Sequence, residues 1–413
     1  MREKFYMKQA NSLKNLKNFQ CAGKRVFVRV DLNVPLKNGQ ILSDYRLKAI
    51  IQTIDFILKN NGKVILATHL GRPNGFVDKN LSTALLVPWF ENRGYQIDFA
   101  PDIMKAYEHS KKDFNKILLL ENLRFLPEEQ DTSKQEAQVL AKNLAQLADI
   151  YINDAFAVMH RNDTSITLVP KYFESSQRGI GFLVAQELET LEHLKSTPTQ
   201  PFILVIGGSK LHDKIGMLEN FLQAPEENRI KTIIIGGLLA QAFLRAQGHT
   251  MGITPIDDAT LQKAHKILKL AQEAQVQISL PTDFYLELTH NYKSRPLTIN
   301  QIPPNGTIID IGPTSVQNFS QMLAQAQTIF ANGTMGVYEN PAYADGTKKI
   351  LQAIASSPAF SVIGGGDINA AAEMFGITHD IDFCSTGGGA TLAYLGAKNP
   401  DVALPGLQAL IKP

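Results

Sequence analysis

Short apolar runs alternate along the first half of the chain with longer segments whose apolar residues recur at helical spacing. Four such runs predict strands, namely residues 24–35 (KRVFVRVDLNVP), 62–73 (GKVILATHLGRP), 116–125 (KILLLENLRF) and 150–161 (IYINDAFAVMHR). The segments between them, such as 48–59 and 133–147, suit helices. Strands that alternate with helices predict parallel βαβ units, in which binding sites lie at the carboxyl ends of the strands.

The second half repeats a different pattern, in which apolar runs end on glycine. These runs are residues 201–210 (PFILVIGGSK), 231–243 (KTIIIGGLLAQAF), 306–315 (GTIIDIGPTS), 328–337 (TIFANGTMGV) and 360–367 (FSVIGGGD). A sixth run, residues 276–284 (VQISLPTDF), ends in Pro and Asp. We expect the five glycine turns to lie on one edge of a parallel sheet, where a flat base, a ribose and phosphates can approach the backbone closely.

The segment between these two halves reads as a connector. Apolar residues recur at helical spacing through Leu188, Leu191 and Leu194, and the two prolines of STPTQP then break the pattern. We therefore predict two domains, residues 1–180 with a C-terminal tail of residues 400–413, and residues 200–399. Residues 181–199 would join them. A chain of 413 residues is long enough for two hydrophobic cores.

Composition narrows the class of protein. A hydrophobic content of 44% indicates packed globular domains, and a net charge of +2 gives no general signal for nucleic acid. Only Cys21 and Cys384 are present, which fits a reducing compartment. No uninterrupted apolar segment has the length of a membrane span, so we expect a cytoplasmic protein without a nucleic acid or membrane partner.

Basic side chains follow the predicted strands of the first half. Where those strands end, we expect the following residues to converge: Arg46, His69, Arg72, Arg124, His160 and Arg161. Several arginines aimed at one place favour a small, multiply charged anion, because the guanidinium group pairs well with phosphate or carboxylate. A single arginine would more simply be a solvated surface charge. Asp31, Asn33 and Asn122 could bind ligand hydroxyls, hold the arginines, or only cap the strand ends.

The stretch from Phe360 to Met374 predicts a strand, a tight turn and the start of a helix. The unpaired N–H groups of such a helix start would stabilise phosphate, and Asp367 could hold an accompanying metal ion. A tight crossing with no ligand would use the same glycines. The stretch is not a P-loop, and Asn369 occupies the third glycine position of a dinucleotide fingerprint. Lys210 and Lys214 add positive charge beside the first glycine turn of this half.

Across nearly the whole chain, several segments resemble the signature segments of the phosphoglycerate kinase family, in the family's order. They include VRVDLNVP, THLGRP, LLLENLRF, IGGSK, NGTMGVYE, GGGD and STGGGA. The resemblance implies an α/β enzyme of two Rossmann-like domains with parallel sheets, joined by an interdomain helix across a hinge cleft, the C-terminal tail returning to the first domain. It also implies reversible phosphoryl transfer between 1,3-bisphosphoglycerate and MgADP, giving 3-phosphoglycerate and MgATP, by a monomer.

Site residues follow from the resemblance position by position. It assigns to the phosphoglycerate Asp31, Asn33, Arg46, His69, Leu70, Gly71, Arg72, Arg124 and Arg161. It assigns to the nucleotide Gly208, Lys214, Gly237, Asn332, Glu339, Gly365, Gly366, Asp367 and Ile368. It makes Arg46 and Lys210 catalytic, and Asp367 the ligand of Mg2+, which accompanies ATP or ADP.

Three residues depart from the family pattern on the nucleotide side. Leu238 stands where a third glycine is usual, Thr334 replaces a proline, and Ile368 replaces Thr or Ser. These departures bear on nucleotide affinity and selectivity. They also motivate a rival hypothesis, a catalytically weak nucleotide or anion binder. A dehydrogenase is a more distant alternative, because the dinucleotide fingerprint is broken.

Overall fold

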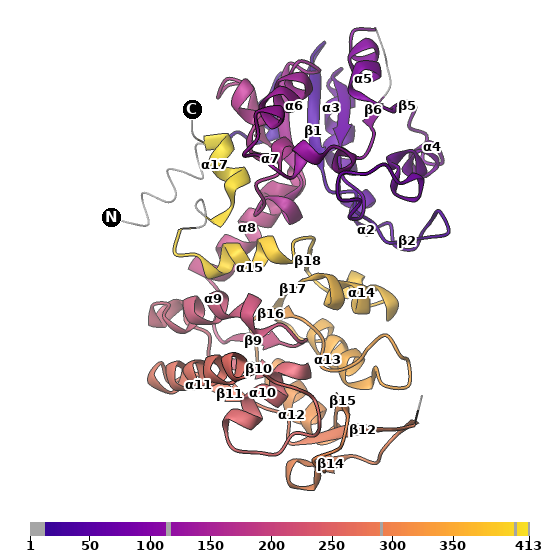
Figure 1. Cartoon of the computed structure of the whole chain (residues 1–413). Helices are drawn as coiled ribbons and strands as arrows, with labels where there is room; N and C mark the ends of the chain where they lie inside the picture. Colours follow the sequence, from indigo (N-terminus) through magenta and orange to yellow (C-terminus); the bar gives the residue numbers. More distant parts are fainter. Residues whose placement is uncertain (1–12, 113–116, 290–291, 400–402, 412–413) are drawn as a thin grey trace. The chain divides into compact units, whose positions relative to one another are not determined.

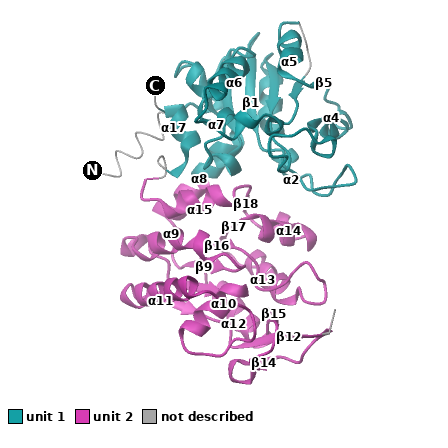
Figure 2. Ribbon diagram, viewed as in Figure 1, with its two compact units in different colours: residues 1–189, 401–413 teal, residues 190–400 magenta. Residues whose placement is uncertain are grey.

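A computed structural model describes residues 13–112, 117–289, 292–399 and 403–411 (Figure 1). The chain forms two compact units, residues 1–189 with 401–413, and residues 190–400 (Figure 2). The division falls within helix α8 (Phe182–Ser196), which lies inside the predicted connector. In the part of the chain that is described, no helix is long and apolar enough to span a membrane.

Unit 1 is built on a six-stranded sheet, in the order β5-β6-β4-β1-β7-β8, and every pairing is parallel. Its strands are β1 (Arg25–Val30), β4 (Lys63–Ala67), β5 (Ile97–Ala100), β6 (Ile117–Leu120), β7 (Ile150–Asp154) and β8 (Arg178–Ile180). A short antiparallel hairpin adds β2 (Leu36–Lys37) and β3 (Gln40–Ile41). The central strand β1 is buried except at its first residue, which explains its nearly continuous apolar sequence.

The helices of unit 1 are α2 (Tyr45–Ala49), α3 (Ile51–Lys59), α4 (Val87–Glu91), α5 (Ile103–Ser110), α6 (Gln135–Ala145), α7 (Thr164–Thr167) and α17 (Pro405–Ile411). Its 3-10 helices are η1 (Leu16–Asn18), η2 (Lys79–Leu81), η3 (Thr83–Leu86), η4 (Leu123–Phe125), η5 (Pro127–Glu129), η6 (Phe156–Val158) and η7 (Val169–Tyr172). The C-terminal helix α17 is tied to this unit, because Gly406 N donates to Met159 O at 3.0 Å and Arg178 Nε donates to Leu410 O at 3.1 Å.

Unit 2 is built on a second six-stranded parallel sheet, in the order β11-β10-β9-β16-β17-β18. Its strands are β9 (Phe202–Ile206), β10 (Thr232–Ile235), β11 (Gln277–Ser279), β16 (Thr328–Asn332), β17 (Phe360–Gly364) and β18 (Phe383–Ser385). Its helices are α9 (Leu211–Leu222), α10 (Gly237–Ala246), α11 (Asp258–Glu273), α12 (Pro313–Leu323), α13 (Asp345–Ala355), α14 (Gly366–Met374) and α15 (Gly389–Gly396), with η8 (Glu226–Asn228), η9 (Ile299–Gln301) and η10 (Thr378–Asp380).

One of the five predicted glycine-ended strands lies outside this parallel sheet, so the expectation of five glycine turns on its edge was wrong in part. Strand β15 (Ile308–Ile311) pairs antiparallel with β12 (Asp283–Thr289), in a small sheet with β13 (Tyr292–Lys293) and β14 (Leu297–Thr298). Asp283 explains the arrangement, because its carboxylate accepts the N–H groups of Thr314 and Ser315 and so joins β12 to the start of α12. Strand β18, which the pattern had not predicted, completes the parallel sheet.

Candidate functional site

The carboxyl ends of β1, β4 and β6 in unit 1 bring several of the predicted anion-binding residues into one hydrogen-bonded network. Asp31 follows β1 and pairs with the guanidinium of Arg46 on α2. Asn33 Oδ1 accepts the N–H of Gly71 at 2.8 Å. The carbonyl of Gly71 in turn accepts Arg124 Nη1 at 2.9 Å. These contacts join three separate strand ends, as expected for neighbouring parallel strands.

Asn122 organises the loop after β4. Its Oδ1 accepts the N–H of Leu70 at 3.1 Å, and its Nδ2 donates to the Leu70 carbonyl at 2.7 Å and to the Leu81 carbonyl at 2.8 Å. The Leu70 side chain lies in the core of unit 1. Asn122 therefore uses both backbone polar groups of Leu70, and the Leu70 side chain packs in the core.

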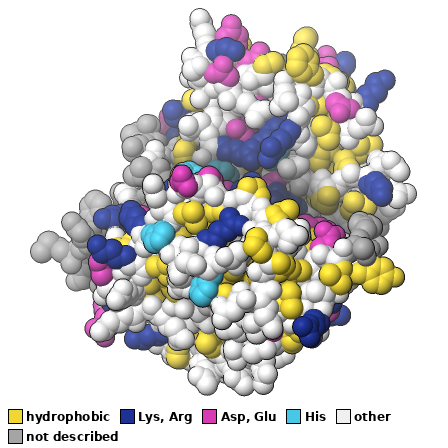
Figure 3. Space-filling view, turned by 60° about the horizontal axis from the view of Figure 1, so that its bottom comes forward, with side chains coloured by type: hydrophobic (Ala, Val, Ile, Leu, Met, Phe, Trp, Pro, Cys, Tyr) yellow, Lys and Arg dark blue, Asp and Glu magenta, His cyan; other side chains and the backbone are white. Residues whose placement is uncertain are grey.

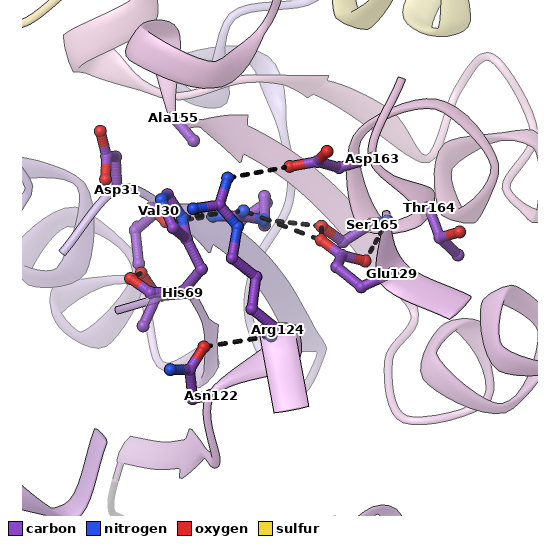
Figure 4. Close-up of polar contacts among 12 residues, drawn as sticks. Val30, Asp31, His69, Asn122, Arg124, Glu129, Ala155, Asp163, Thr164 and Ser165 are labelled. Atoms are coloured by element: carbon purple, nitrogen blue, oxygen red, sulfur yellow. Dashed lines mark hydrogen bonds and ion pairs between the residues drawn. The ribbon is translucent and has the colours of Figure 1, made fainter. Parts of the chain in front are cut away.

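Arg124 is a buried cation whose hydrogen-bonding capacity is only partly used. Its side chain extends between Asn122 and Asp163 (Figure 4), with Nη2 3.8 Å from Asp163 Oδ2. Within the described residues, neither its Nε nor its Nη2 has a hydrogen-bond partner, although both atoms are buried. Buried donors are rarely left unpaired, because each one costs its full desolvation free energy. An oxyanion at this place would satisfy both.

Like charges lie close to Arg124. Burial lowers the pKa of its guanidinium, and the charge of Arg161 lowers that pKa further. Burial also lowers the pKa of His160, which lies near Arg161 and Asp163. Arg72, by contrast, is exposed to solvent. On the face drawn in Figure 3, Lys and Arg side chains stand in several separate places. On a chain of net charge +2, the cluster of Arg124 with Arg161 is a local feature, suited to a compact anion.

Asp31 keeps its charge although it is buried. Burial by itself would raise the pKa of its carboxyl, but several opposing contributions, of which the charge of Arg46 is the largest and the N–H of Asn33 a smaller one, leave the pKa below its ordinary value. The pair holds the Arg46 guanidinium, whose side chain is 29% exposed, beside the ends of β1 and β4. Arg46 thus combines a fixed position with access to a ligand.

In unit 2, the glycine turns after β9, β10 and β16 are joined by backbone contacts. The N–H of Gly208 donates to Thr334 O at 2.8 Å, that of Gly237 to Met335 O at 2.8 Å, and that of Leu239 to Gly208 O at 3.1 Å. A Cβ added to Gly237 would lie 2.7 Å from Gly208 N. The three turns pack too closely for side chains, which leaves a floor of bare backbone. Thr334 fits this floor, since its hydroxyl donates to Gly336 O.

The turn between β17 and α14 begins a nine-residue helix, and the strand, turn and helix predicted for Phe360 to Met374 are confirmed. Gly365 adopts a left-handed φ of 118°. The first intrahelical bond runs from Asn369 N to Gly365 O, so the N–H groups of Gly366, Asp367 and Ile368 have no partner within the helix. Asn332 supports the turn by donating to the Gly364 carbonyl.

The Ile368 side chain lies in the core of unit 2 with 3% exposure. Its replacement of a hydroxyl residue therefore changes packing, whereas its N–H group remains at the start of α14. Asp367 and Glu339 are exposed and both act on the pKa of Tyr338, which burial raises first and their charges raise further. The loop that carries Glu339 thus lies near the start of α14.

Lys214 brings a buried cation to the same region. Its Nζ donates to the Gly207 carbonyl at 2.8 Å, and the residue as a whole is 7% exposed. Burial lowers its pKa to about 8, against the opposing charge of Asp367, while the like charge of Lys210 lowers it as well. Lys210, Lys214 and Asp367 therefore share one electrostatic environment.

Sequence reasoning missed the residues beneath the basic cluster of unit 1. Arg29 and Glu129 are both fully buried, and Ser165 bridges them. The signal for Arg29 was a charged residue between two valines of a predicted strand. Nothing in the sequence around Glu129 distinguishes it from its half-buried neighbour Glu128.

Comparisons with known proteins match this geometry. Residues 16–398 match the family model described as phosphoglycerate kinase. A phosphoglycerate kinase of Roseiflexus sp. (strain RS-1) is 36% identical over 96% of this chain and 98% of its own length. A cytosolic phosphoglycerate kinase of Crithidia fasciculata is 35% identical over 94% of this chain and 95% of its own length. The crystal structure of phosphoglycerate kinase from Pyrococcus horikoshii OT3 is similar, with a TM-score of 0.84 and 32% sequence identity. The match covers 96% of this chain and 98% of that one. The chain belongs to the phosphoglycerate kinase family.

Proposed function

We propose that this protein transfers a phosphoryl group reversibly between 1,3-bisphosphoglycerate and MgADP, giving 3-phosphoglycerate and MgATP. The observation that carries the proposal is buried Arg124, whose Nε and Nη2 have no hydrogen-bond partner among the described residues and which lies in a cluster of further basic side chains. 3-Phosphoglycerate carries a carboxylate and a phosphate, and both groups suit guanidinium donors. Family membership supplies the identity of the substrate.

Within this proposal the residues of unit 1 bind and orient the phosphoglycerate. Arg124, Arg161 and Arg72 would contact its anionic groups, and Asp31 and Asn33 would hold Arg46 and the Gly71 loop. The accepting carboxylate is already ionised, so the reaction requires no strong general base. Its main demand is stabilisation of the charge on the phosphoryl oxygens, which positioned cations provide. Arg46 and Lys210 would act there.

The residues of unit 2 would bind the nucleotide. The floor of Gly208 and Gly237 would face the base and ribose, and the N–H groups at the start of α14 would hold phosphate oxygens, with the positive end of the helix dipole adding to the attraction. Glu339 would accept from ribose hydroxyls. Because the two ligand sites belong to different units, direct transfer requires the units to close on one another, and α8 would carry the hinge.

Asp367 fits a magnesium ion. Among the residues that the structure describes, no cluster of three or more His, Cys, Asp or Glu could hold a metal. Magnesium in kinases needs no such cluster, since it is held by one or two carboxylates, water and the phosphates of the nucleotide. The exposed carboxylate of Asp367, beside unpaired N–H groups, matches that requirement. When bound, the ion would neutralise the charge of the phosphate chain.

A coupled assay with MgATP and 3-phosphoglycerate tests the proposal directly. We expect turnover that requires both substrates and magnesium. Turnover at background, with calorimetry detecting both ligands, would instead support binding without catalysis. The cytoplasmic location and the monomeric state stay predictions; two relatives are named cytosolic and one glycosomal.

The kcat/KM for MgATP is expected to fall as the pH rises above about 8. Burial lowers the pKa of Lys214 to about 8, so the free protein loses this positive charge above that pH, and with it attraction for the phosphates. A pH profile of kcat/KM measures the effect. Lys214→Arg keeps the charge and should move the fall to higher pH. An identical profile in that variant would assign the fall to another group.

A further inference from the structure

Arg29 is a fully buried arginine at the centre of the unit 1 sheet, directly beneath the predicted anion site. It lies on β1, between β4 and β7, one residue before Val30, and its Nη1 donates to the Val30 carbonyl. Its Nε donates to Ser165 Oγ at 2.7 Å. Its Nη2 lies 3.4 Å from Nδ1 of His69, which follows β4. The guanidinium therefore contacts β1, the loop after β4 and α7.

Glu129 and Ser165 hold this guanidinium in place. Ser165 donates to both carboxylate oxygens of Glu129, from its backbone N at 2.9 Å and from its Oγ at 2.5 Å. Glu129 Oε1 lies 3.9 Å from Arg29 Nη2, and the side chains of Arg29, Glu129 and Ser165 are all buried. With Nε, Nη1 and Nη2 each directed at a different partner, Arg29 has one orientation available.

This orientation decides which nitrogen of His69 carries the proton. Arginine can only donate hydrogen bonds, since its guanidinium has no acceptor atom and stays protonated. Nδ1 of His69 must therefore present its lone pair to Arg29 Nη2. A proton on Nδ1 would instead point at the N–H of Arg29, so the ring must carry its single proton on Nε2.

The surroundings of His69 also oppose a second proton. The ring is 1% exposed. Burial lowers its pKa first, the charges of Arg29, Arg124 and Arg161 lower it further, and only Asp31 acts in the opposite direction. The balance leaves the pKa of His69 well below its ordinary value, so the ring is neutral at physiological pH.

We propose that Arg29 is a positioning residue that holds His69 as the neutral tautomer protonated on Nε2, so that His69 meets an anionic substrate as a hydrogen-bond donor and not as a cation. The identity of that substrate rests on the proposed function, whereas the tautomer does not. The positive charge of the site then comes from its arginines alone. His69 contributes direction, and Glu129 with Ser165 fixes the geometry from below.

Nitrogen-15 NMR of the full chain, labelled at histidine, tests the tautomer without any assay of activity. The chain has nine histidines, so the His69 signals are identified by their loss in His69→Gln. Between about pH 6 and pH 8, where an ordinary histidine titrates, we expect Nε2 to be protonated and Nδ1 to be unprotonated throughout. A proton on Nδ1, in either the other tautomer or an imidazolium, would overturn the proposal.

Adding 3-phosphoglycerate separates this proposal from the proposed function. We expect the His69 signals to shift while Nδ1 remains unprotonated. Signals that do not respond to the ligand would count against the substrate site and leave the tautomer standing. Protonation of Nδ1 on binding would overturn the donor role.

Variants test the part played by Arg29. The double variant Arg29→Met with Glu129→Gln removes the buried cation together with its carboxyl partner, whose pKa burial raises to about 7, so that neither group is left unpaired. In the double variant, we expect His69 to populate both neutral tautomers or to take up a second proton within this pH range. In the single variant Arg29→Lys, which keeps a donor at this position, we expect part of the preference for a proton on Nε2 to remain. Arg178→Met removes another buried arginine of unit 1 and should leave the His69 signals as in the wild type. A double variant that keeps a pure Nε2 tautomer would overturn the role of Arg29, and the wild-type spectrum remains decisive if that variant does not fold.

Discussion

Arg46→Ala is expected to lower kcat by roughly 100- to 1000-fold while KM for 3-phosphoglycerate rises far less, which is the range seen when one preorganised donor to a developing charge is removed. The same result is expected for Lys210→Ala and the nucleotide. Both residues would interact mainly with the transferring phosphoryl group, so their contacts strengthen in the transition state. Steady-state kinetics with each substrate varied in turn measures both parameters.

The structure adds one complication for Arg46, because removing it leaves the buried carboxylate of Asp31 without its cation. Arg46→Lys keeps a charge near Asp31 but loses the planar fork, so it should recover folding stability while most of the loss in kcat remains. Arg25→Ala is a matched control in unit 1, since Arg25 pairs with Asp149 and is the first residue of β1, at the end of the strand opposite to the site. For Lys210, exposed Lys266 serves the same purpose. Losses confined to KM would refute the catalytic roles.

Gly237→Ala is expected to destabilise the protein by about 2–4 kcal/mol, the sum of a left-handed backbone penalty and an overpacked contact. Gly237 has a φ of 61°, and an added Cβ would lie 2.7 Å from Gly208 N and 2.8 Å from Thr334 O. Both neighbours are backbone atoms that bond each other, so neither can move alone. The midpoint of urea unfolding, followed by circular dichroism, measures the change.

Gly248→Ala is the control that separates the two contributions. Gly248 also has a left-handed φ, of 93°, but nothing lies within 4 Å of an added Cβ. We expect it to lose only the backbone penalty, about 1–2 kcal/mol. If both variants lost the same amount, the close packing of the three glycine turns would carry no free energy of its own.

The fold was predictable where a strand with the local sequence pattern of a parallel strand also lies in a parallel sheet. Strand β1 and the β17 to α14 turn could be predicted because apolar runs, glycines and helix signals are adjacent in the sequence. Strand β15 has the same local pattern, yet it pairs antiparallel with β12, which depends on Asp283 bonding to residues some thirty positions later. A period of two residues indicates a strand but does not specify the sheet that it joins.

The candidate site was predictable for residues at strand ends and not for those beneath them. Parallel strands bring Asp31, His69 and Arg124 to one edge by their register alone. The contact of Glu129 with Ser165 joins η5 to α7 across the tertiary fold, and no spacing in the sequence announces it. Leu70 and Ile368 were predicted as site residues because they match positions in family motifs. In the structure, the side chains of both residues pack in the hydrophobic cores.

The buried side chain of Ile368 bears on how such a site can vary through evolution. If the start of α14 holds phosphate through N–H groups, every amino acid except proline supplies the same donor at that position. Selection on residue 368 then acts through the fit of its side chain to the core of unit 2 and not through the ligand. Family searches that require a hydroxyl residue there would overlook functional members, whereas the geometry of the turn would still identify them.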